Sequence, residues 1–235
     1  FCSGATTSVN AVAGVATFSN LCIQGSSGSY TLTFASSGLT SSDSNSFNLQ
    51  VGNVSKISLT TPAATSNSGA AFGTQPIVTF QDSGGNTVTS NTSTITATVS
   101  TGGTIVGTAA VAAVSGVVTY SGLGLTGATG TYTLTYTVTT GSTSLTALTQ
   151  TIAIAAGTAT KLVITTQPVN TANGATFANI VVKVEDSGSN VVTTSTASVS
   201  ASIKSGSGSF CSGATSSVNA VSGVATFSNL CIQGT

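Results

Sequence analysis

Charged side chains are almost missing from this chain of 235 residues. They make up 3% of the sequence, against roughly 25% in an ordinary soluble domain. Nucleic-acid binding needs clustered basic side chains that neutralise phosphates, so the four lysines, dispersed along the chain, exclude a nucleic-acid partner. The chain has no net charge, so copies of it do not repel one another. The composition therefore favours self-association that depends little on salt.

Histidine, arginine, tryptophan and methionine are absent. Histidine is the usual general base and the side chain that titrates between pH 5 and 8. The one cluster of ionisable groups contains Lys183, Glu185 and Asp186, and its charges alternate with Val182 and Val184. This alternation is typical of a solvent-facing strand surface. We therefore predict no enzymatic activity, no catalytic residue and no cofactor.

Long apolar runs are missing as well. The longest run of small apolar residues, 108–118, contains threonine, serine and glycine. It falls short of the ~20 apolar residues that cross a bilayer. We therefore expect no insertion into a membrane.

The chain contains an internal repeat. Residues 1–25, the first copy, recur as residues 210–234, the last copy, with two substitutions. A fainter echo lies between them, because Gly-Val-Ala-Thr-Phe at 14–18 and 223–227 matches Gly-Val-Val-Thr-Tyr at 116–120. We interpret the chain as two related modules in alternation, A with cysteines and B without them.

Only module B is predicted to be complete, over residues 53–157. Residues 1–52 form the C-terminal part of a module A, and residues 158–235 form the N-terminal part of the next module A. Since domain boundaries normally fall in exposed linkers, we expect the chain to be a window onto a longer repetitive polypeptide.

Apolar and hydroxyl side chains alternate along most of the chain. Tyr30, Leu32 and Phe34 alternate with threonines, a period of two that predicts half-buried strands. Val-Ala-Gly-Val and Val-Ser-Gly-Val suit two-residue hairpin turns. About seven strands per module predict an all-β fold of immunoglobulin-like Greek-key β-sandwich modules in a linear array, with a barrel as the alternative.

Several motifs resemble a known family. Lys-Leu-Val-Ile-Thr-Thr-Gln-Pro at 161–168, Asp-Ser-Gly-Gly-Asn at 82–86 and Tyr-Thr-Leu-Thr-Phe at 30–34 resemble the tandem bacterial immunoglobulin-like repeats of invasin and intimin type adhesins and giant repetitive surface proteins. The resemblance covers the whole chain and implies a secreted, surface-attached array. The scarcity of charge departs from that family.

The cysteines occur in module A only, where both members of a pair are present together. This co-occurrence, with a hairpin turn near the midpoint, predicts two disulfide bonds, each worth ~3 kcal/mol in the chain-entropy model, and an oxidising, extracellular setting. A metal site is the weaker alternative, because no histidine is available. The predicted disulfide residues are Cys2 with Cys22 and Cys211 with Cys231.

Oxygen-bearing turn residues offer a candidate calcium site in two loops. Asp82 with Asn86, and Asp186 with Asn190, have the ligand types that calcium prefers, although Asp and Asn also cap tight turns through their own backbone. We favour turn capping. Two N-glycosylation sequons predict sugar attachment at Asn53 and Asn91.

The sequence therefore predicts a non-enzymatic structural segment of an extracellular filament, stalk or surface fibre, whose partners are neighbouring modules or chains. One alternative is an adhesin array that binds a glycan, ice or a host surface. A second alternative is a fibre subunit whose incomplete module is completed by strand donation from a neighbour.

Overall fold

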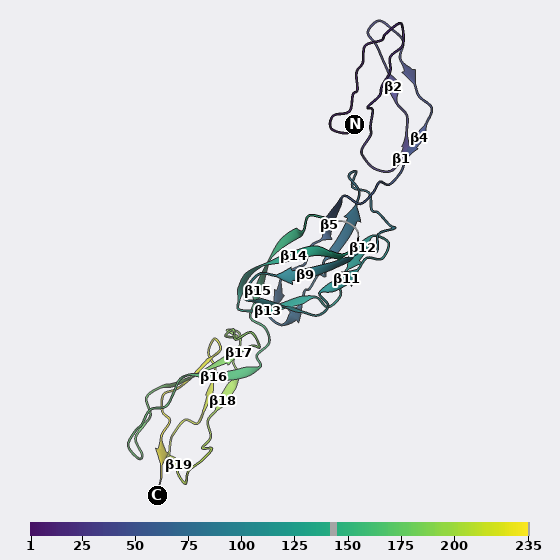
Figure 1. The fold of residues 1–235 in the computed structure, drawn as a ribbon. Coiled ribbons are helices and arrows are strands. Elements are labelled where there is room, and N and C mark those ends of the chain that lie inside the picture. The colour runs from purple at the N-terminus through teal and green to yellow at the C-terminus, as the bar shows by residue number, and fades with distance from the viewer. Residues whose placement is uncertain (142–144, 235) are drawn as a thin grey trace.

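A computed structural model describes residues 1–141 and 145–234. Over this range the chain is all-β and contains no helix, and accordingly no helix there could cross a membrane. Figure 1 shows the chain drawn out lengthwise as three bodies, with the N-terminus in the body at one end and the C-terminus at the tip of the body at the other end. We call these bodies the N-terminal segment (1–52), the central segment (53–157) and the C-terminal segment (158–235).

The central segment contains three sheets. One has the order β12-β8-β5, a second has the order β11-β9-β14-β15-β6, and a third has the order β10-β13-β7. All neighbours are antiparallel except β15 and β6. The strands are β5 (Lys56–Thr61), β6 (Ser66–Asn67), β7 (Ala70–Ala71), β8 (Ile77–Gln81), β9 (Thr94–Val99), β10 (Gly103–Val106), β11 (Ala110–Ala112), β12 (Val117–Thr119), β13 (Gly124–Gly127), β14 (Gly130–Thr140) and β15 (Leu148–Ala155).

The alternation along β14 explains the core of this segment. Tyr132, Leu134 and Tyr136 are buried, while the threonines between them face outward. They pack with side chains of the opposite sheet, including the fully buried Phe80. Burying each large apolar side chain stabilises the fold by about 1.5–3 kcal/mol, so this cluster is the main source of stability. The hydroxyl of the buried Tyr120 donates to the Ile95 carbonyl at 3.1 Å, which satisfies its polar atom.

The C-terminal segment has fewer strands and a smaller core. Its sheets have the orders β16-β17-β21, β18-β20 and β19-β22. The core gathers the inward side chains of β17 and β21 with Val199 and Leu230. The strands are β16 (Lys161–Thr166), β17 (Ile180–Glu185), β18 (Ser198–Ser200), β19 (Ser209–Phe210), β20 (Ser217–Asn219), β21 (Val224–Phe227) and β22 (Ile232–Gln233).

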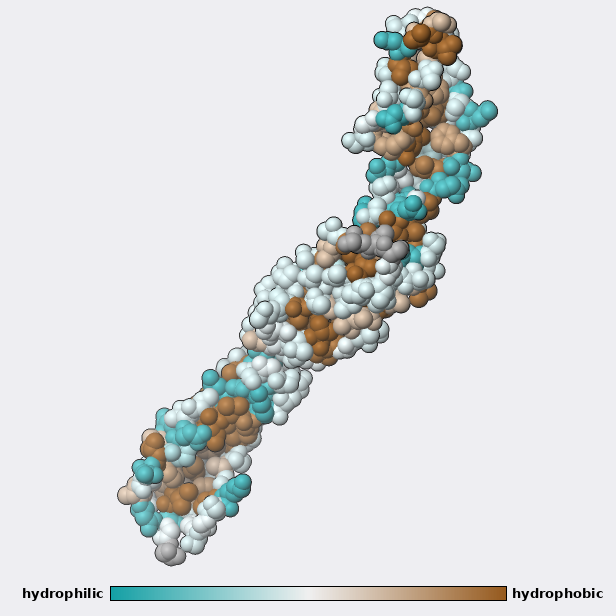
Figure 2. Space-filling model, in the orientation of Figure 1, coloured by the Kyte–Doolittle hydropathy of each residue, from teal (hydrophilic) through white to brown (hydrophobic). Residues whose placement is uncertain are grey.

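The N-terminal segment consists of two short ladders and no buried residue. Strand β1 (Gly28–Tyr30) pairs with β4 (Phe47–Leu49), and β2 (Thr33–Phe34) pairs with β3 (Ser42–Asp43). Figure 2 shows hydrophobic patches on its surface and on that of the C-terminal segment.

The predicted two-residue hairpin turns are confirmed. Isolated bridges join Val12 with Val15, and the equivalent valines in the other two segments. Both turn residues have positive φ at each site, for example 51° at Ser115 and 76° at Gly116. A Cβ atom at Gly116 would lie 2.4 Å from the Val88 carbonyl oxygen, so glycine is required there.

Candidate functional site

The candidate site is a loop that occurs twice, once at each junction between segments. Asp82–Asn86 follows β8, and Asp186–Asn190 follows β17. In both loops the aspartate N–H donates to the asparagine carbonyl at 3.0 Å. The closed turn holds the Asp and Asn side chains beside each other, as expected for turn-capping residues.

The aspartate carboxylates also reach the linker that precedes each loop. The Gly52 N–H donates to Asp82 Oδ2 at 2.8 Å, and the Gly157 N–H donates to Asp186 Oδ2 at 2.6 Å. Gly52 and Gly157 lie at the borders of the N-terminal and central segments. Each carboxylate therefore fastens the entering chain to the loop of the following segment.

The asparagine side chains extend the contact to a turn of the preceding segment. Asn86 Nδ2 donates to the Gly25 carbonyl at 2.8 Å, and its Oδ1 accepts from the Ser27 N–H at 2.7 Å. Asn190 makes the matching pair of bonds to Gly127 at 2.8 Å and Thr129 at 2.6 Å. Both junctions are thus built from the same donors and acceptors.

Glycine makes this close approach possible. A Cβ atom at Gly84 would lie 2.2 Å from the Gly25 carbonyl oxygen, and one at Gly188 would lie 2.6 Å from the Gly127 carbonyl oxygen. Real Cβ atoms do not approach so closely. The glycine of the motif is therefore a packing requirement between segments.

Hydrogen bonds stabilise the two buried carboxylates. The Asn86 side chain, followed by the Gly52 N–H, lowers the pKa of Asp82 from 3.8 to about 2. For Asp186 burial acts to raise the pKa, but donors led by Asn190 and Gly157 lower it overall. Donors that bind the charged form favour ionisation, so both groups carry their charge at neutral pH.

The calcium residues predicted from the sequence are brought together in pairs. Asp82 meets Asn86 and Asp186 meets Asn190, but each amide directs its N–H group at both carboxylate oxygens. A cation would have to displace these donors. Residues 1–141 and 145–234 hold no cluster of three acidic, histidine or cysteine side chains fit for a metal, so calcium binding stays a prediction.

All four cysteines are paired, Cys2 with Cys22 and Cys211 with Cys231, with Cα atoms 5.5 Å apart in each pair. In each pair the N–H of the first cysteine also donates to the carbonyl of the second at 3.1 Å. Two disulfide bonds point to an oxidising environment.

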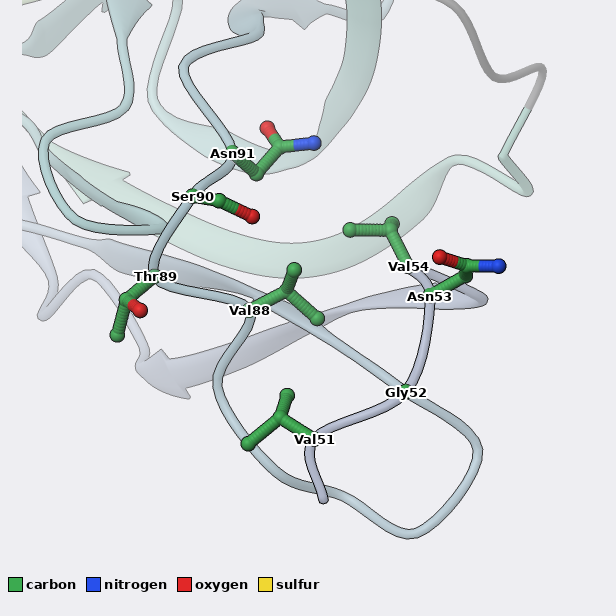
Figure 3. A pocket seen from close by; sticks show the side chains of 8 residues that line it. All are labelled: Val51, Gly52, Asn53, Val54, Val88, Thr89, Ser90 and Asn91. Atoms are coloured by element: carbon green, nitrogen blue, oxygen red, sulfur yellow. The ribbon is translucent and has the colours of Figure 1, made fainter.

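Both sequons lie at one pocket of about 510 Å³ beside the first junction (Figure 3). Asn53 is exposed, whereas Asn91 is half-buried and its Oδ1 accepts from the Ser93 N–H at 3.0 Å. The pocket also contains the apolar side chains of Val51 and Val88. Asn53 is consequently the more accessible of the two predicted sugar acceptors.

The expectation that Lys183 and Glu185 share a solvent-facing surface is wrong for Glu185. Val182 and Val184 face the core as predicted, but Glu185 is also buried. Its carboxylate lies 3.9 Å from Lys161 Nζ in an ion pair. The loop after β17 folds back beside the strand end, through a bridge between Glu185 and Val191.

A second candidate surface is the outer face of the five-stranded sheet. Threonines of β14 stand opposite threonines of both neighbouring strands, including Thr135 between Thr98 and Thr149. Thr96 and Thr139 share a hydroxyl hydrogen bond of 2.9 Å. The face offers regularly spaced hydroxyl and methyl groups without charge, suited to a neutral, hydroxyl-rich ligand.

Comparison of the chain with protein-family models and with curated proteins found no match.

Proposed function

We propose that this chain is a non-enzymatic structural segment of an extracellular filament, stalk or surface fibre. The main support is that the same three contacts occur at both junctions. A linker N–H donates to the Asp carboxylate, the Asn amide donates to a backbone carbonyl, and a turn N–H donates to the Asn side-chain oxygen. A repeated junction repeats its angle, so successive units follow one another in a regular line.

The hydrogen bonds at the junction restrict bending between segments more than they add to the stability of either segment. A neutral hydrogen bond contributes about 0.5–1.5 kcal/mol net, so the two Asn86 bonds add little stability. They join a turn of one segment to a loop of the next, and each of these is already held by its own internal hydrogen bonds. Neighbour contacts of this kind govern the behaviour of linear arrays. The junction therefore restricts bending, while each segment folds around its own interior.

Further features support this placement and architecture. Facing sheets around one core in the central segment support an immunoglobulin-like sandwich for each unit. The disulfide bonds support a location outside the cell, at its surface. The neutral composition supports a chain that neither repels its neighbours nor attracts charged ligands.

Small-angle X-ray scattering of a junction variant tests the proposal. Asn86→Ala with Asn190→Ala should shorten the mean end-to-end distance and broaden its distribution, because both segment-to-segment amides are lost. Asn48→Ala, on the exposed face of β4, is the control and should leave the scattering unchanged. Identical curves for the double variant and the unaltered chain would refute the stiffening role.

The threonine face supports a second candidate function, adhesion to a glycan or to ice. Its cross-strand pairs keep hydroxyl groups at strand spacing. Glycan-array binding and thermal hysteresis of the unaltered chain, compared with Thr133→Lys and Thr135→Lys, test this candidate. Activity that the lysines abolish would establish it, and complete inertness would exclude it.

A further inference from the structure

Asn173 and Gly174 form the one Asn-Gly pair in the sequence. Both residues are exposed, on a tight turn that the Ala175 N–H closes by donating to the Ala172 carbonyl at 3.0 Å. Gly174 has a φ of 77°, as the third residue of a type II turn requires. An Asn-Gly pair is prone to deamidation, because glycine has no side chain to hinder attack by its own nitrogen on the asparagine side chain.

Deamidation at this pair needs no reagent except water. The Gly174 backbone nitrogen attacks Asn173 Cγ, the bond from Cγ to Nδ2 breaks, and the side-chain nitrogen leaves as ammonia with the proton that the backbone nitrogen gives up. The product is a cyclic succinimide, which water opens at either carbonyl to aspartate or isoaspartate. The reaction therefore requires a backbone N–H that is free of an acceptor and a side chain that is free to turn towards it.

In the folded chain both reacting groups are held by β22 and the glycine that follows it. The Gly174 N–H donates to the Ile232 carbonyl at 3.0 Å. Asn173 Nδ2 donates to the Gly234 carbonyl at 3.0 Å, and Asn173 Oδ1 accepts from the Gly234 N–H at 2.9 Å. These bonds occupy the attacking nitrogen and fix the amide, so the closed turn resists the reaction although it is exposed to water.

The disulfide bond between Cys211 and Cys231 holds β22 in place. Cys231 directly precedes β22 and forms a bridge with Thr176, two residues beyond the Asn-Gly pair. Cys211 Sγ lies 3.9 Å from the Gly174 carbonyl oxygen, so the disulfide bond packs against the turn itself. The ladder between β19 and β22 has only two residue pairs. The disulfide bond is therefore a covalent restraint beside a short ladder.

The central segment makes the same contacts without either feature. Its counterpart of Asn173 is Ser68, whose Oγ accepts from the Gly127 N–H at 3.1 Å and donates to the Gly127 carbonyl at 2.9 Å. The next N–H, that of Gly69, donates to the Leu125 carbonyl at 2.9 Å. Serine cannot deamidate, and residues 53–157 contain no cysteine. The reactive pair and the disulfide bond thus occur together in one kind of module.

We propose that Asn173 is a deamidation site whose reaction the fold suppresses and the Cys211–Cys231 disulfide bond controls. Reduction lets β22 leave the turn, which frees the Gly174 N–H and the Asn173 amide together. Aspartate or isoaspartate lacks the Nδ2 donor and directs a negative charge at the Gly234 carbonyl, so the turn does not close as before. A C-terminal segment that has opened is thereby marked irreversibly, whereas the central segment recloses without such a mark.

Peptide mapping by mass spectrometry of the full chain, incubated at mildly alkaline pH, tests the proposal. Deamidation of Asn173 should be slow in the oxidised chain and fastest in urea with reductant. In the reduced chain without urea its rate should rise by about a hundredfold, the factor by which a disulfide bond restrains opening in the chain-entropy model. Equal rates in the oxidised and reduced chains would overturn the proposal, and so would an unreactive Asn173 in urea.

The chain offers matched controls for this experiment. Asn67 lies in the equivalent turn of the central segment, and its deamidation rate should not respond to reductant. Cys211→Ser with Cys231→Ser should reproduce the reduced rate without reductant. Asn173→Ser copies Ser68 and should keep the melting temperature of the oxidised chain, whereas Asn173→Asp should lower it. Equal melting temperatures for these two variants would overturn the claim that the deamidated product no longer fits the turn.

Discussion

Asp82 accepts hydrogen bonds from Asn86 and Gly52, and these donors hold its pKa at about 2 instead of 3.8. A carboxyl whose pKa is lowered by folding stabilises the fold above its unfolded pKa and loses that contribution as the pH falls through the folded pKa. We therefore predict that the first junction is intact at pH 4 and loosens near pH 2.

The amide resonance of Gly52 reports this titration directly. In a pH series by NMR its shift should change with a midpoint near 2. Asp82→Asn should abolish the change, whereas Asp43→Asn, on the exposed strand β3, should leave it in place. A midpoint at or above 3.8 would show that the carboxylate does not hold the linker.

Gly84 lies against the Gly25 carbonyl with no space for a side chain. We predict that Gly84→Ala opens the first junction, at a cost of about 1–3 kcal/mol, the range for overpacked sites. Limited proteolysis should then cut faster near residue 52. The control is Gly73→Ala, because a Cβ atom there meets no atom within 4 Å; equal cleavage rates for the two variants would contradict the prediction.

The sequence identified these loop residues but not their contacts with the preceding segment. Asp and Asn at a four-residue spacing predict a capped turn, since the contact is local. The bond from Asn86 to Gly25 joins residues 61 positions apart. No periodicity of the chain encodes such a contact, although the motif recurs at nearly the same distance from the preceding glycine, with Asp82 30 residues after Gly52 and Asp186 29 residues after Gly157, and this was a usable signal.

At the scale of strands, equivalent leucines offer a matched comparison. Leu134 of β14 is fully buried, whereas Leu32, at the same position of the N-terminal hairpin, is half-buried. Leu134→Ala should lower the free energy of unfolding by about 2–5 kcal/mol, through lost burial and a cavity. Leu32→Ala should cost much less in dilute solution.

Urea unfolding followed by tyrosine circular dichroism measures this difference, because three of the four tyrosines lie in the central segment. The two variants should differ by more than about 1 kcal/mol. Similar losses for both variants would contradict the prediction that the cost follows the burial of the leucine.

Strand alternation predicted the all-β fold correctly, because a side chain's face follows from its place in the pleat. It could not predict how much of each face is covered. Ala16 and Ala225 have nearly the same local sequence and opposite burial, and Glu185 is buried although alternation places it on the outer face of its strand. Coverage depends on which other strands pack against the face, and this is a property of the assembled unit.

At the scale of the whole molecule, the extended form places few charges near one another. Lys161 and Glu185 form the one ion pair in the described part of the chain. An exposed or half-exposed pair contributes about 0–1 kcal/mol and is screened by salt. The shape and stability of the molecule therefore depend on apolar burial and on hydrogen bonds between segments, and little on ion pairs.

We predict that the melting temperature and the scattering-derived length stay nearly constant between 20 mM and 1 M sodium chloride, because screening has almost no charge interaction to act on. Sodium chloride is the appropriate salt, since sulfate strengthens apolar burial by itself. Any loss of stability with added salt should be limited to the C-terminal segment, which contains the Lys161–Glu185 ion pair. Lys161→Gln removes this pair and is the control, because its stability should not respond to salt at all. A marked shortening with added salt would instead show that long-range charge interactions hold the segments in line.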